Sequence, residues 1–186
     1  LGGLEETRKA LEWFREETKK AGHPDLHLQL TVWSENAINM SGVDGGEKKT
    51  TKDIAKAAGF DSMTHYQFVH FTDIDRDYMD ILQDVKKEWA RLDQEYPIPY
   101  YPHVTIGWDN NPRFKEFRAG IVKGNTPEAF EKGLHMAKEY LDRHPQQAPL
   151  VTINSWNEWT ETSYLEPDDL NGYGYLEAVK KVFGSK

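Results

Sequence analysis

The sequence predicts an α/β fold of the (β/α)₈ TIM-barrel type, with this chain covering roughly the C-terminal half in about four βα units. Segments with strand character alternate with segments with helix character at intervals of about 40 residues, which favours a mainly parallel sheet with helices on its faces. A whole barrel needs about 250 residues, and the chain has 186. We therefore expect residues 1–186 to form a single α/β unit, the C-terminal half of such a barrel.

A half-barrel leaves the strands at both ends of its sheet without neighbours, and proteins usually cover such open edges. We therefore expect the N-terminal half of the barrel as a partner, in the same parent chain or in another chain. A closed α/β layer of four units is the alternative architecture.

Two strand-and-helix units are expected in the first part of the chain. Apolar residues at helical spacing among charged ones predict an amphipathic helix from Leu4 to about Gly22. The alternating stretch LHLQLTVW predicts a strand over residues 26–33, followed by a polar, glycine-containing loop over residues 41–51. A short helix over residues 52–58 and a second strand over residues 61–68 complete this part.

Two further units are expected in the second part. A continuous apolar stripe from Ile74 to Tyr96 predicts a long helix, which Pro97 and Pro99 prevent from continuing. A helix that begins near Thr126, with Pro127 in its first turn, is closed by Pro145. The remaining predicted elements are strands over residues 101–108 and 150–156 and a final helix over residues 173–183.

The charge balance excludes several classes of partner. The formal net charge is −8, so nucleic acids and anionic membrane surfaces would be repelled, and neither is expected as a partner. No apolar stretch approaches the ~20 residues that cross a bilayer, and the first residues lack the order of a signal peptide. We expect a soluble chain, and the compartment of the parent protein, periplasmic or secreted among others, stays open. The absence of cysteine excludes disulfides, thiolate nucleophiles and cysteine-based zinc sites.

Aromatic and polar residues gather just after the predicted strands, where parallel α/β proteins place their functional groups. Flat aromatic faces suit the apolar faces of sugar rings, and carboxylates and amides suit sugar hydroxyls, so an oligo- or polysaccharide substrate is expected. The candidate substrate-binding residues are Trp33, His65, Tyr66, Trp108, Asp109, Trp156, Asn157, Trp159 and Glu166. Turn formation is the alternative role for Asp109, and packing is the alternative for His65 and Tyr66.

Glu158 and Glu161 are the candidate catalytic residues, three positions apart between two tryptophans. On a tight or short helical turn, two such carboxylates can face the same way and approach the ~5–5.5 Å spacing of retaining glycoside hydrolysis. Unlike environments would separate their pKa values, leaving one carboxyl protonated as general acid and the other ionised as base or nucleophile. The alternative is that both are helix N-terminal carboxylates and that Trp156 and Trp159 are packing residues.

The same part of the chain resembles the WbsX-type proteins related to glycoside hydrolase family 99. The resemblance rests on WNEWTE at residues 156–161, YLEPD at 164–168 and GYGYLE at 172–177, with TIGWDNNPR at 105–113 and GFD at 59–61 in support. It implies a (β/α)₈ barrel, endo-acting cleavage of α-mannosides with retention of configuration, and no cofactor.

The resemblance also implies roles for the two glutamates. Glu158 would deprotonate the sugar 2-hydroxyl, which attacks its own anomeric carbon, and Glu161 would protonate the leaving oxygen. Two positions depart from the mannosidase pattern, since Thr160 stands where those enzymes typically carry His and Thr162-Ser163 replaces a Gly-Thr-like step.

Two other functions stay open. One is a non-catalytic carbohydrate-binding barrel domain that uses its tryptophans as stacking surfaces. The other is a polysaccharide-biosynthesis glycosyltransferase, a label that some WbsX-type proteins carry, although no phosphate-binding glycine loop supports it. No catalytic metal is expected, because His103, Asp109, Glu158 and Glu166 show no HxH or HExxH spacing. Arg113 is expected either in solvent or paired with an acidic side chain or an anionic sugar.

Overall fold

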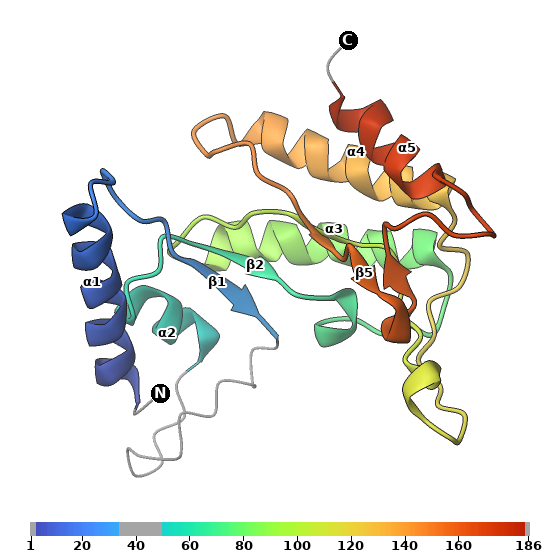
Figure 1. Cartoon of the computed structure of the whole chain (residues 1–186), viewed down its shortest axis with the longest axis horizontal. Helices are drawn as coiled ribbons and strands as arrows, with labels where there is room; N and C mark the ends of the chain where they lie inside the picture. The colour runs from blue at the N-terminus through green and yellow to red at the C-terminus, as the bar shows by residue number, and fades with distance from the viewer. Residues whose placement is uncertain (1–2, 34–49, 185–186) are drawn as a thin grey trace. The chain divides into compact units, whose positions relative to one another are not determined.

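The computed structural model describes residues 3–33 and 50–184 (Figure 1). These residues divide into two compact units, the first within Leu1–His65 and Leu92–Tyr101 and the second within Tyr66–Arg91 and Pro102–Lys186. Each unit contains one parallel pair of strands. The expectation that both units belong to one α/β half-barrel stays a prediction.

The first unit is built around a parallel pair of strands, β1 (Gln29–Val32) and β2 (Ser62–His65), connected through α2 (Thr51–Ala57). All four residues of β2 are buried. The α2 helix begins with a capping box, in which Thr50 and Asp53 satisfy each other's main-chain N–H groups. The amphipathic helix α1 (Leu4–Lys20) precedes β1, and its Arg15 lies 2.6 Å from the carboxylate of Asp61.

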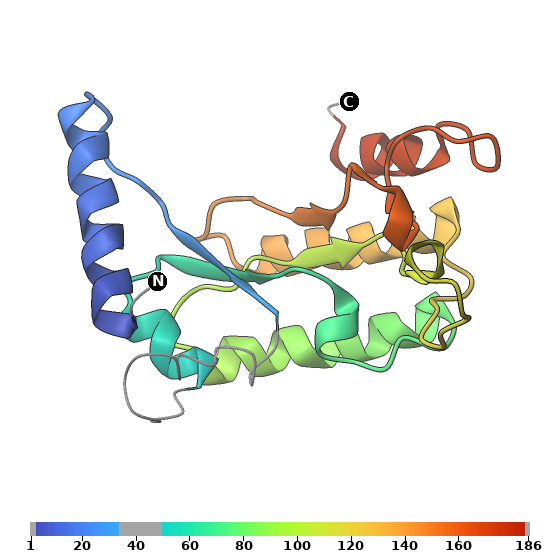
Figure 2. The same cartoon turned by 60° about the horizontal axis from the view of Figure 1, so that its bottom comes forward.

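The second unit contains the parallel pair β3 (His103–Thr105) and β4 (Thr152–Asn154), connected through α4 (Pro127–Arg143). Thr126 caps α4 and Pro127 occupies its first turn, as the sequence predicts. The final helix α5 (Gly174–Phe183) packs against α4, and α4 in turn packs against β3 (Figure 2). The helix α3 (Tyr78–Glu95) begins in this unit, and its residues from Leu92 onward belong to the first.

A close approach between α4 and β3 forms the core of the second unit. A Cβ atom at Gly133 would lie 3.1 Å from both the Tyr78 hydroxyl and Cγ1 of Val104, so glycine allows the helix to come this near. The Tyr78 hydroxyl donates to the carbonyl of Thr105 at 2.6 Å. Phe130 and Leu134 of α4 are fully buried here, and burying one such side chain stabilises the fold by about 1.5–3 kcal/mol.

All four predicted strands and all five predicted helices are present, and the alternation of strands with helices is confirmed. The strands are shorter than predicted, because only three or four residues of each make ladder hydrogen bonds. Phe68, placed in the second strand from sequence, lies in a 3₁₀ turn, η1 (Phe68–His70). Most of the expected loop over residues 41–51 falls outside the described residues, and Thr51 opens α2.

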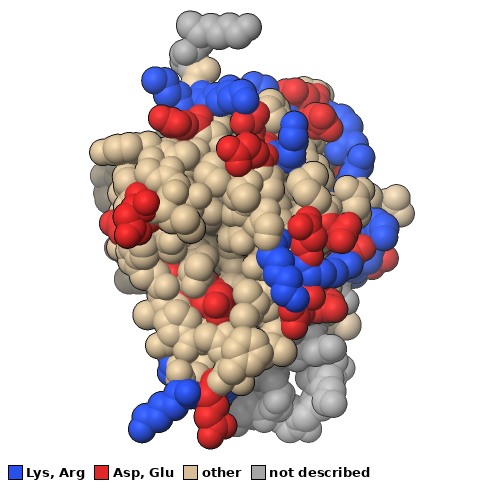
Figure 3. Space-filling model, turned by 90° about the vertical axis from the view of Figure 1, so that its right-hand side faces the viewer, with Lys and Arg blue, Asp and Glu red and all other residues tan. Residues whose placement is uncertain are grey.

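The charged side chains are mixed in sign on the face shown in Figure 3, where Lys and Arg side chains lie beside Asp and Glu side chains. Broad uncharged surface separates these charged groups. Among the described helices, none has the length and apolar character needed to span a membrane.

Candidate active site

A short antiparallel hairpin that the sequence did not predict carries the two candidate catalytic glutamates. Its strands β5 (Asn157–Glu158) and β6 (Ser163–Tyr164) flank a 3₁₀ turn, η3 (Trp159–Glu161). Thr162 closes the turn in the left-handed conformation, at φ 52°. Two serines fix the hairpin to the end of β4: the Ser163 hydroxyl donates to the carbonyl of Asn154, and the Ser155 hydroxyl donates to the carbonyl of Ser163, both at 2.8 Å.

Gln67 links the hairpin to the ends of β3 and β4. This fully buried side chain donates to Oδ1 of Asn154 at 2.9 Å and to the carbonyl of Gly107 at 3.2 Å. Its own amide oxygen accepts from the Thr105 hydroxyl at 2.7 Å and from the main-chain N–H of Phe68 at 3.1 Å. The strand ends and the hairpin base therefore share one hydrogen-bond network, which restricts the position of the turn above it.

The two glutamates converge on one guanidinium group. Arg113, the last residue of the 3₁₀ turn η2 (Asn111–Arg113) after β3, places Nη2 2.8 Å from Oε1 of Glu158 and Nη1 2.9 Å from Oε1 of Glu161. Glu161 is buried, with 6% of its surface exposed, whereas Glu158 is partly exposed. Both carboxylates therefore contact one guanidinium group at the hairpin turn, and their predicted spacing and catalytic role stay predictions.

Further hydrogen bonds hold each glutamate in place. The Thr160 hydroxyl donates to Oε1 of Glu158 at 2.9 Å, and the Ser155 hydroxyl accepts from the Glu158 main-chain N–H at 3.1 Å. On the other side of the turn, the main-chain N–H of Asp109 donates to the carbonyl of Glu161 at 2.8 Å. The turn is therefore fastened both to the end of β4 and to the loop after β3.

The surroundings of Glu161 favour its protonated form. Its Oε2 atom is buried without a hydrogen-bond partner, and such an oxygen is costly to ionise. Burial raises the pKa of the Glu161 carboxyl above its ordinary value; Arg113 opposes this rise, and the negative charge of Glu158 adds to it. The net direction suits a carboxylic acid that carries a proton to a leaving group.

Aromatic rings border the turn. The indole of Trp159 stacks on the ring of Tyr164, and its Nε1 donates to Oε2 of Glu166 at 2.6 Å. Tyr164 covers one face of this indole, yet 45% of Trp159 stays exposed, and Trp156 is 54% exposed. Exposed indole surface beside two carboxylates suits a sugar ring, because it offers an apolar face next to hydrogen-bonding groups.

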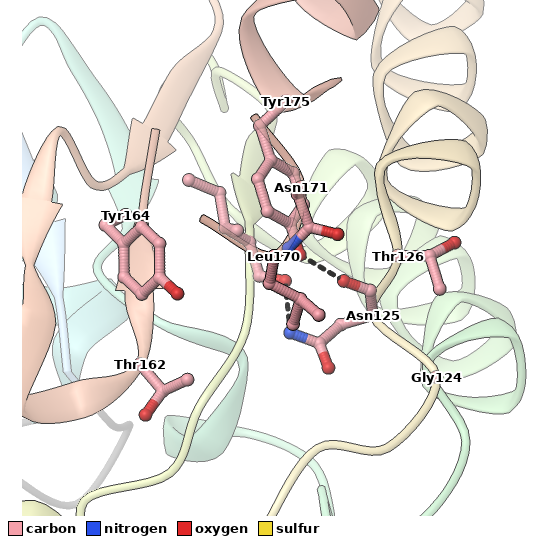
Figure 4. A pocket seen from close by; sticks show the side chains of 9 residues that line it. Gly124, Asn125, Thr126, Thr162, Tyr164, Leu170, Asn171 and Tyr175 are labelled. Atoms are coloured by element: carbon pink, nitrogen blue, oxygen red, sulfur yellow. Dashed lines mark hydrogen bonds between the residues drawn. The ribbon is translucent and has the colours of Figure 1, made fainter. Parts of the chain in front are cut away.

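A cavity of about 240 Å³ lies beside the hairpin (Figure 4). Thr162 and Tyr164 face it from the hairpin, and Asn125, Asn171 and Tyr175 lie opposite them. The Tyr175 hydroxyl donates to the main-chain carbonyl of Asn125. Neither Glu158 nor Glu161 lines this cavity, so the acid pair and the cavity are separate features of the second unit.

The other predicted substrate-binding residues are placed in different surroundings. In the first unit, Trp33 is exposed after β1, and His65 is buried with Nδ1 3.0 Å from the Tyr100 hydroxyl. In the second unit, the rings of Tyr66 and His70 are in contact, with centroids 5.9 Å apart. The packing alternative therefore describes the position of His65 as it stands, and its contact with substrate stays a prediction.

The remaining candidates lie in the second unit. Trp108 is half-buried after β3, and Asn157 is exposed on β5. Asp109 forms the expected turn, in which its Oδ1 accepts from the main-chain N–H and from the side-chain Nδ2 of Asn111, at 2.9 and 2.7 Å. Substrate contact by these three residues stays a prediction.

The acids and histidines of the described residues do not assemble into a group of three or more that could hold a metal ion. His103, one of the residues considered for such a role, is buried between Thr152 and Thr105. Burial lowers the pKa of this imidazole to about 3, with a smaller contribution from His70. His103 is therefore a neutral core residue.

The sequence did not define the role of Arg113, because both a position in solvent and a pairing with an acidic group were compatible with it. The available signal was topological. Neighbouring parallel strands end at the same edge of a sheet, so the loop after β3 and the hairpin after β4 had to lie close together. An arginine in one and two glutamates in the other were therefore candidates for ion pairing.

Comparison with known protein families gives a match over nearly the whole chain. The family model described as "Glycosyltransferase WbsX" matches residues 2–179. The resemblance to WbsX-type proteins is thus confirmed. Curated relatives include the "Uncharacterized protein WxcX" from two strains of Xanthomonas campestris pv. campestris, each 29% identical over 155 residues. The match covers 78% of this chain and 22% of each relative, so the chain spans about a fifth of their length.

Solved structures share the fold. A "Glycoside hydrolase-like protein" matches 97% of this chain and 50% of its own chain, with a TM-score of 0.64 and 14% identity. The mixed α/β fold is therefore consistent with a TIM-barrel-type architecture. A GH99 endo-alpha-mannosidase from Bacteriodes thetaiotaomicron matches 70% of this chain and 41% of its own, with a TM-score of 0.46 and 15% identity.

Proposed function

We propose that this chain, which belongs to the WbsX glycosyltransferase family, carries the catalytic centre of a glycoside hydrolase. The observation that carries the proposal is the meeting of Glu158 and Glu161 at the guanidinium group of Arg113. Both carboxylates contact the same group, and we propose that they adopt the ~5–5.5 Å spacing that retaining glycoside hydrolysis uses. The raised pKa of Glu161 supplies the asymmetry between acid and base that this chemistry needs.

The proposed reaction proceeds in two steps with retention of configuration. Glu158 takes the proton of the sugar 2-hydroxyl, whose oxygen attacks the anomeric carbon, while Glu161 gives its proton to the departing oxygen and the glycosidic bond breaks. Water then attacks the anomeric carbon of the anhydro-sugar. Glu161 takes the proton of that water, and Glu158 returns a proton to the 2-oxygen, which restores both residues.

The proposed substrate is a glycan, with an internal α-mannoside linkage as the bond that is cleaved. Exposed indole surface of Trp156 and Trp159 supplies apolar contact beside the acids. We propose that Asn157 on β5 and Glu166, which accepts from the indole of Trp159, bind sugar hydroxyls. We propose that Trp33, His65, Tyr66, Trp108 and Asp109 contribute further contacts.

We also propose that the N-terminal half of a barrel, from the parent chain or another chain, completes the site. The apolar side of α1 supports this, because the helix has an amphipathic pattern but no buried residue, and Trp13 and Phe14 are 54% and 50% exposed. An amphipathic helix normally buries its apolar stripe. Hydrogen exchange in α1 should be slower in the parent protein than in residues 1–186 alone, and equal rates would contradict this part of the proposal.

The test of function is digestion of a glycan library by the parent protein and by residues 1–186, with Glu158→Gln and Glu161→Gln variants of both. The proposal expects each substitution to lower turnover by about 10²–10⁴-fold, the range for loss of a general acid or base. Glu139→Gln changes an exposed glutamate on α4 and should leave turnover unchanged. Full activity in either of the first two variants would remove that residue from the mechanism.

The family description supports one second candidate, a glycosyltransferase. That function requires binding of a nucleotide-sugar or lipid-linked donor, which calorimetry with such donors would detect. Glycan binding that survives both substitutions, with no product from any substrate, would instead indicate a non-catalytic carbohydrate-binding domain.

A further inference from the structure

We infer that Arg113 is a positioning residue that holds Glu158 and Glu161 together at the hairpin turn and limits how tightly Glu161 holds its proton. This inference rests on the proposed function for its meaning in catalysis. Its physical content, control of two carboxyl groups by one guanidinium group, can be measured without turnover.

Each of the three guanidinium nitrogens of Arg113 makes a contact on the hairpin turn. Nη2 donates to Glu158 and Nη1 contacts Glu161, at 2.8 and 2.9 Å, and Nε donates to the Thr160 hydroxyl at 2.8 Å. The Thr160 hydroxyl bridges Arg113 and Glu158, because it also donates to Oε1 of Glu158 at 2.9 Å. A planar fork can contact three neighbouring acceptors in this way, whereas an ammonium group is a single point charge.

The two carboxylates are supported unequally. Oε1 of Glu158 accepts from both Arg113 and Thr160, and the side chain is partly open to solvent. Glu161 contacts Arg113 through Oε1 alone, and its Oε2 is buried without a partner. The proton that general-acid catalysis needs therefore belongs on Glu161, while Arg113 keeps its contacts with Glu158 and Thr160.

Among the described residues, Arg113 and Glu158 are the charged groups that act on Glu161. Two nearby carboxylates have other hydrogen-bond partners. After β3, Oδ1 of Asp109 accepts from Nδ2 of Asn111, and after β6, Oε2 of Glu166 accepts from the indole of Trp159. Arg118, on the same loop as Arg113, lies over the ring of Phe114. Arg113 is thus the cation whose removal should change the proton affinity of Glu161.

Removing the guanidinium has a defined electrostatic consequence. A nearby cation favours the ionised form of a carboxyl group, so its loss makes Glu161 hold its proton more tightly. In a bell-shaped profile of kcat/KM against pH, the alkaline limb reports the acid. That limb should therefore move to higher pH in Arg113→Gln, whereas an arginine that only anchors its loop would lower activity equally at all pH values.

The experiment combines two readouts on the wild type, Arg113→Gln, Arg113→Lys and Arg118→Gln. Carbon-13 NMR of carboxyl-labelled glutamates in residues 1–186 follows Glu161, assigned by its absence in Glu161→Gln. Profiles of kcat/KM against pH are measured on the parent protein with its glycan substrate. We expect Arg113→Gln to raise the pKa of Glu161 and to move the alkaline kinetic limb to higher pH, in each case by about one pH unit.

The lysine variant separates charge from shape. Arg113→Lys should keep the alkaline limb near its wild-type position, because the charge remains, and lower kcat, because an ammonium group cannot present its donors in the planar arrangement of a guanidinium group. Arg118→Gln should leave the alkaline limb in place. If Arg113→Gln does not fold, Thr160→Val tests the positioning role instead: it removes the hydroxyl that bridges Arg113 and Glu158 without changing any charge, and it should lower kcat while the alkaline limb stays in place.

The outcomes distinguish this inference from the proposed function. A shifted Glu161 titration without glycan cleavage would uphold the role of Arg113 and reject the hydrolase. Cleavage with an unmoved alkaline limb and an unmoved Glu161 titration in Arg113→Gln would uphold the hydrolase and overturn the inference.

Discussion

The main-chain N–H of Asp109 donates to the carbonyl of Glu161 at 2.8 Å, which joins the loop after β3 to the turn that carries the buried glutamate. Thr162 adds a second link, because its hydroxyl donates to the carbonyl of Asp109 at 3.1 Å. These contacts connect segments about fifty residues apart in the chain and bring Arg113 to the glutamate pair. The site therefore depends on the ends of two neighbouring parallel strands.

Glu161 should make the stability of the protein depend on pH in a defined direction. Its folded pKa is raised above 4.5 by burial, so the stability it contributes is present at low pH and is lost as pH rises through the folded pKa. Glu161→Gln mimics the protonated acid at all pH values. Its unfolding free energy, measured with urea, should match that of the wild type in acid and exceed it once the pH rises through the folded pKa of Glu161. A variant less stable than the wild type at pH 7 would contradict the buried, proton-retaining state.

Trp159 should contribute binding surface for the glycan. Replacing it by Ala removes the exposed indole and its stack on Tyr164, and an aromatic contact of this kind contributes about 0.5–1.5 kcal/mol. Glycan affinity, measured by calorimetry in a Glu158→Gln background, should fall by roughly 3–10-fold. Trp13→Ala removes a comparably exposed indole on α1 and should leave affinity unchanged. Equal losses in both variants would show that Trp159 has no specific role.

Gln67 should be important for both stability and activity. Gln67→Ala removes a hydrogen-bond donor from the buried Oδ1 of Asn154 and from the carbonyl of Gly107, and each buried group left unsatisfied costs about 1–3 kcal/mol. The unfolding free energy should fall by about 2–4 kcal/mol, and turnover should fall even below the unfolding temperature. Gln146→Ala, at an exposed position, serves as the control. A loss of less than 0.5 kcal/mol, within the ordinary range of about ±0.5 kcal/mol for surface changes, would mean that the network does not fix the hairpin.

His103 should destabilise the protein in acid. Its pKa is lowered to about 3 from 6.5 by burial, so between these values the unfolded chain takes up a proton that the folded chain excludes. Stability is therefore complete above pH 6.5 and falls toward pH 3, with a slope of up to about 1.4 kcal/mol per pH unit. Urea unfolding of the wild type and His103→Gln from pH 4 to 7 measures this difference in slope. The same slope in both proteins would show that His103 titrates normally.

Much of the fold could be predicted because its signals are local. Pro97 and Pro99 follow the end of α3, and Thr126 with Pro127 marks the start of α4. The positions of the strands in the chain were also predictable, since short runs of strand formers precede polar residues. Their exact bounds were not predictable, because a strand includes only the residues that pair with a neighbouring strand, and the sequence does not show that pairing.

The site was predicted less completely, for physical reasons that differ between residues. The glutamate pair was recognisable because both members lie on one short segment. The hairpin around them was missed because β5 and β6 have two residues each, too few to show a period of two. Arg113 and Gln67 act across long separations in the chain, 45 residues to Glu158 and 87 to Asn154, and such contacts leave no local pattern.

The most direct measurement uses proton NMR to identify the anomer that the parent protein first releases from an α-mannoside glycan. The wild type, Glu158→Gln, Glu161→Gln and Glu139→Gln are compared in parallel. We expect the wild type and Glu139→Gln to release the α-anomer, and turnover to be about 10²–10⁴-fold lower in the other two variants. Release of the β-anomer, or undiminished turnover without either glutamate, would contradict retaining hydrolysis by the glutamate pair.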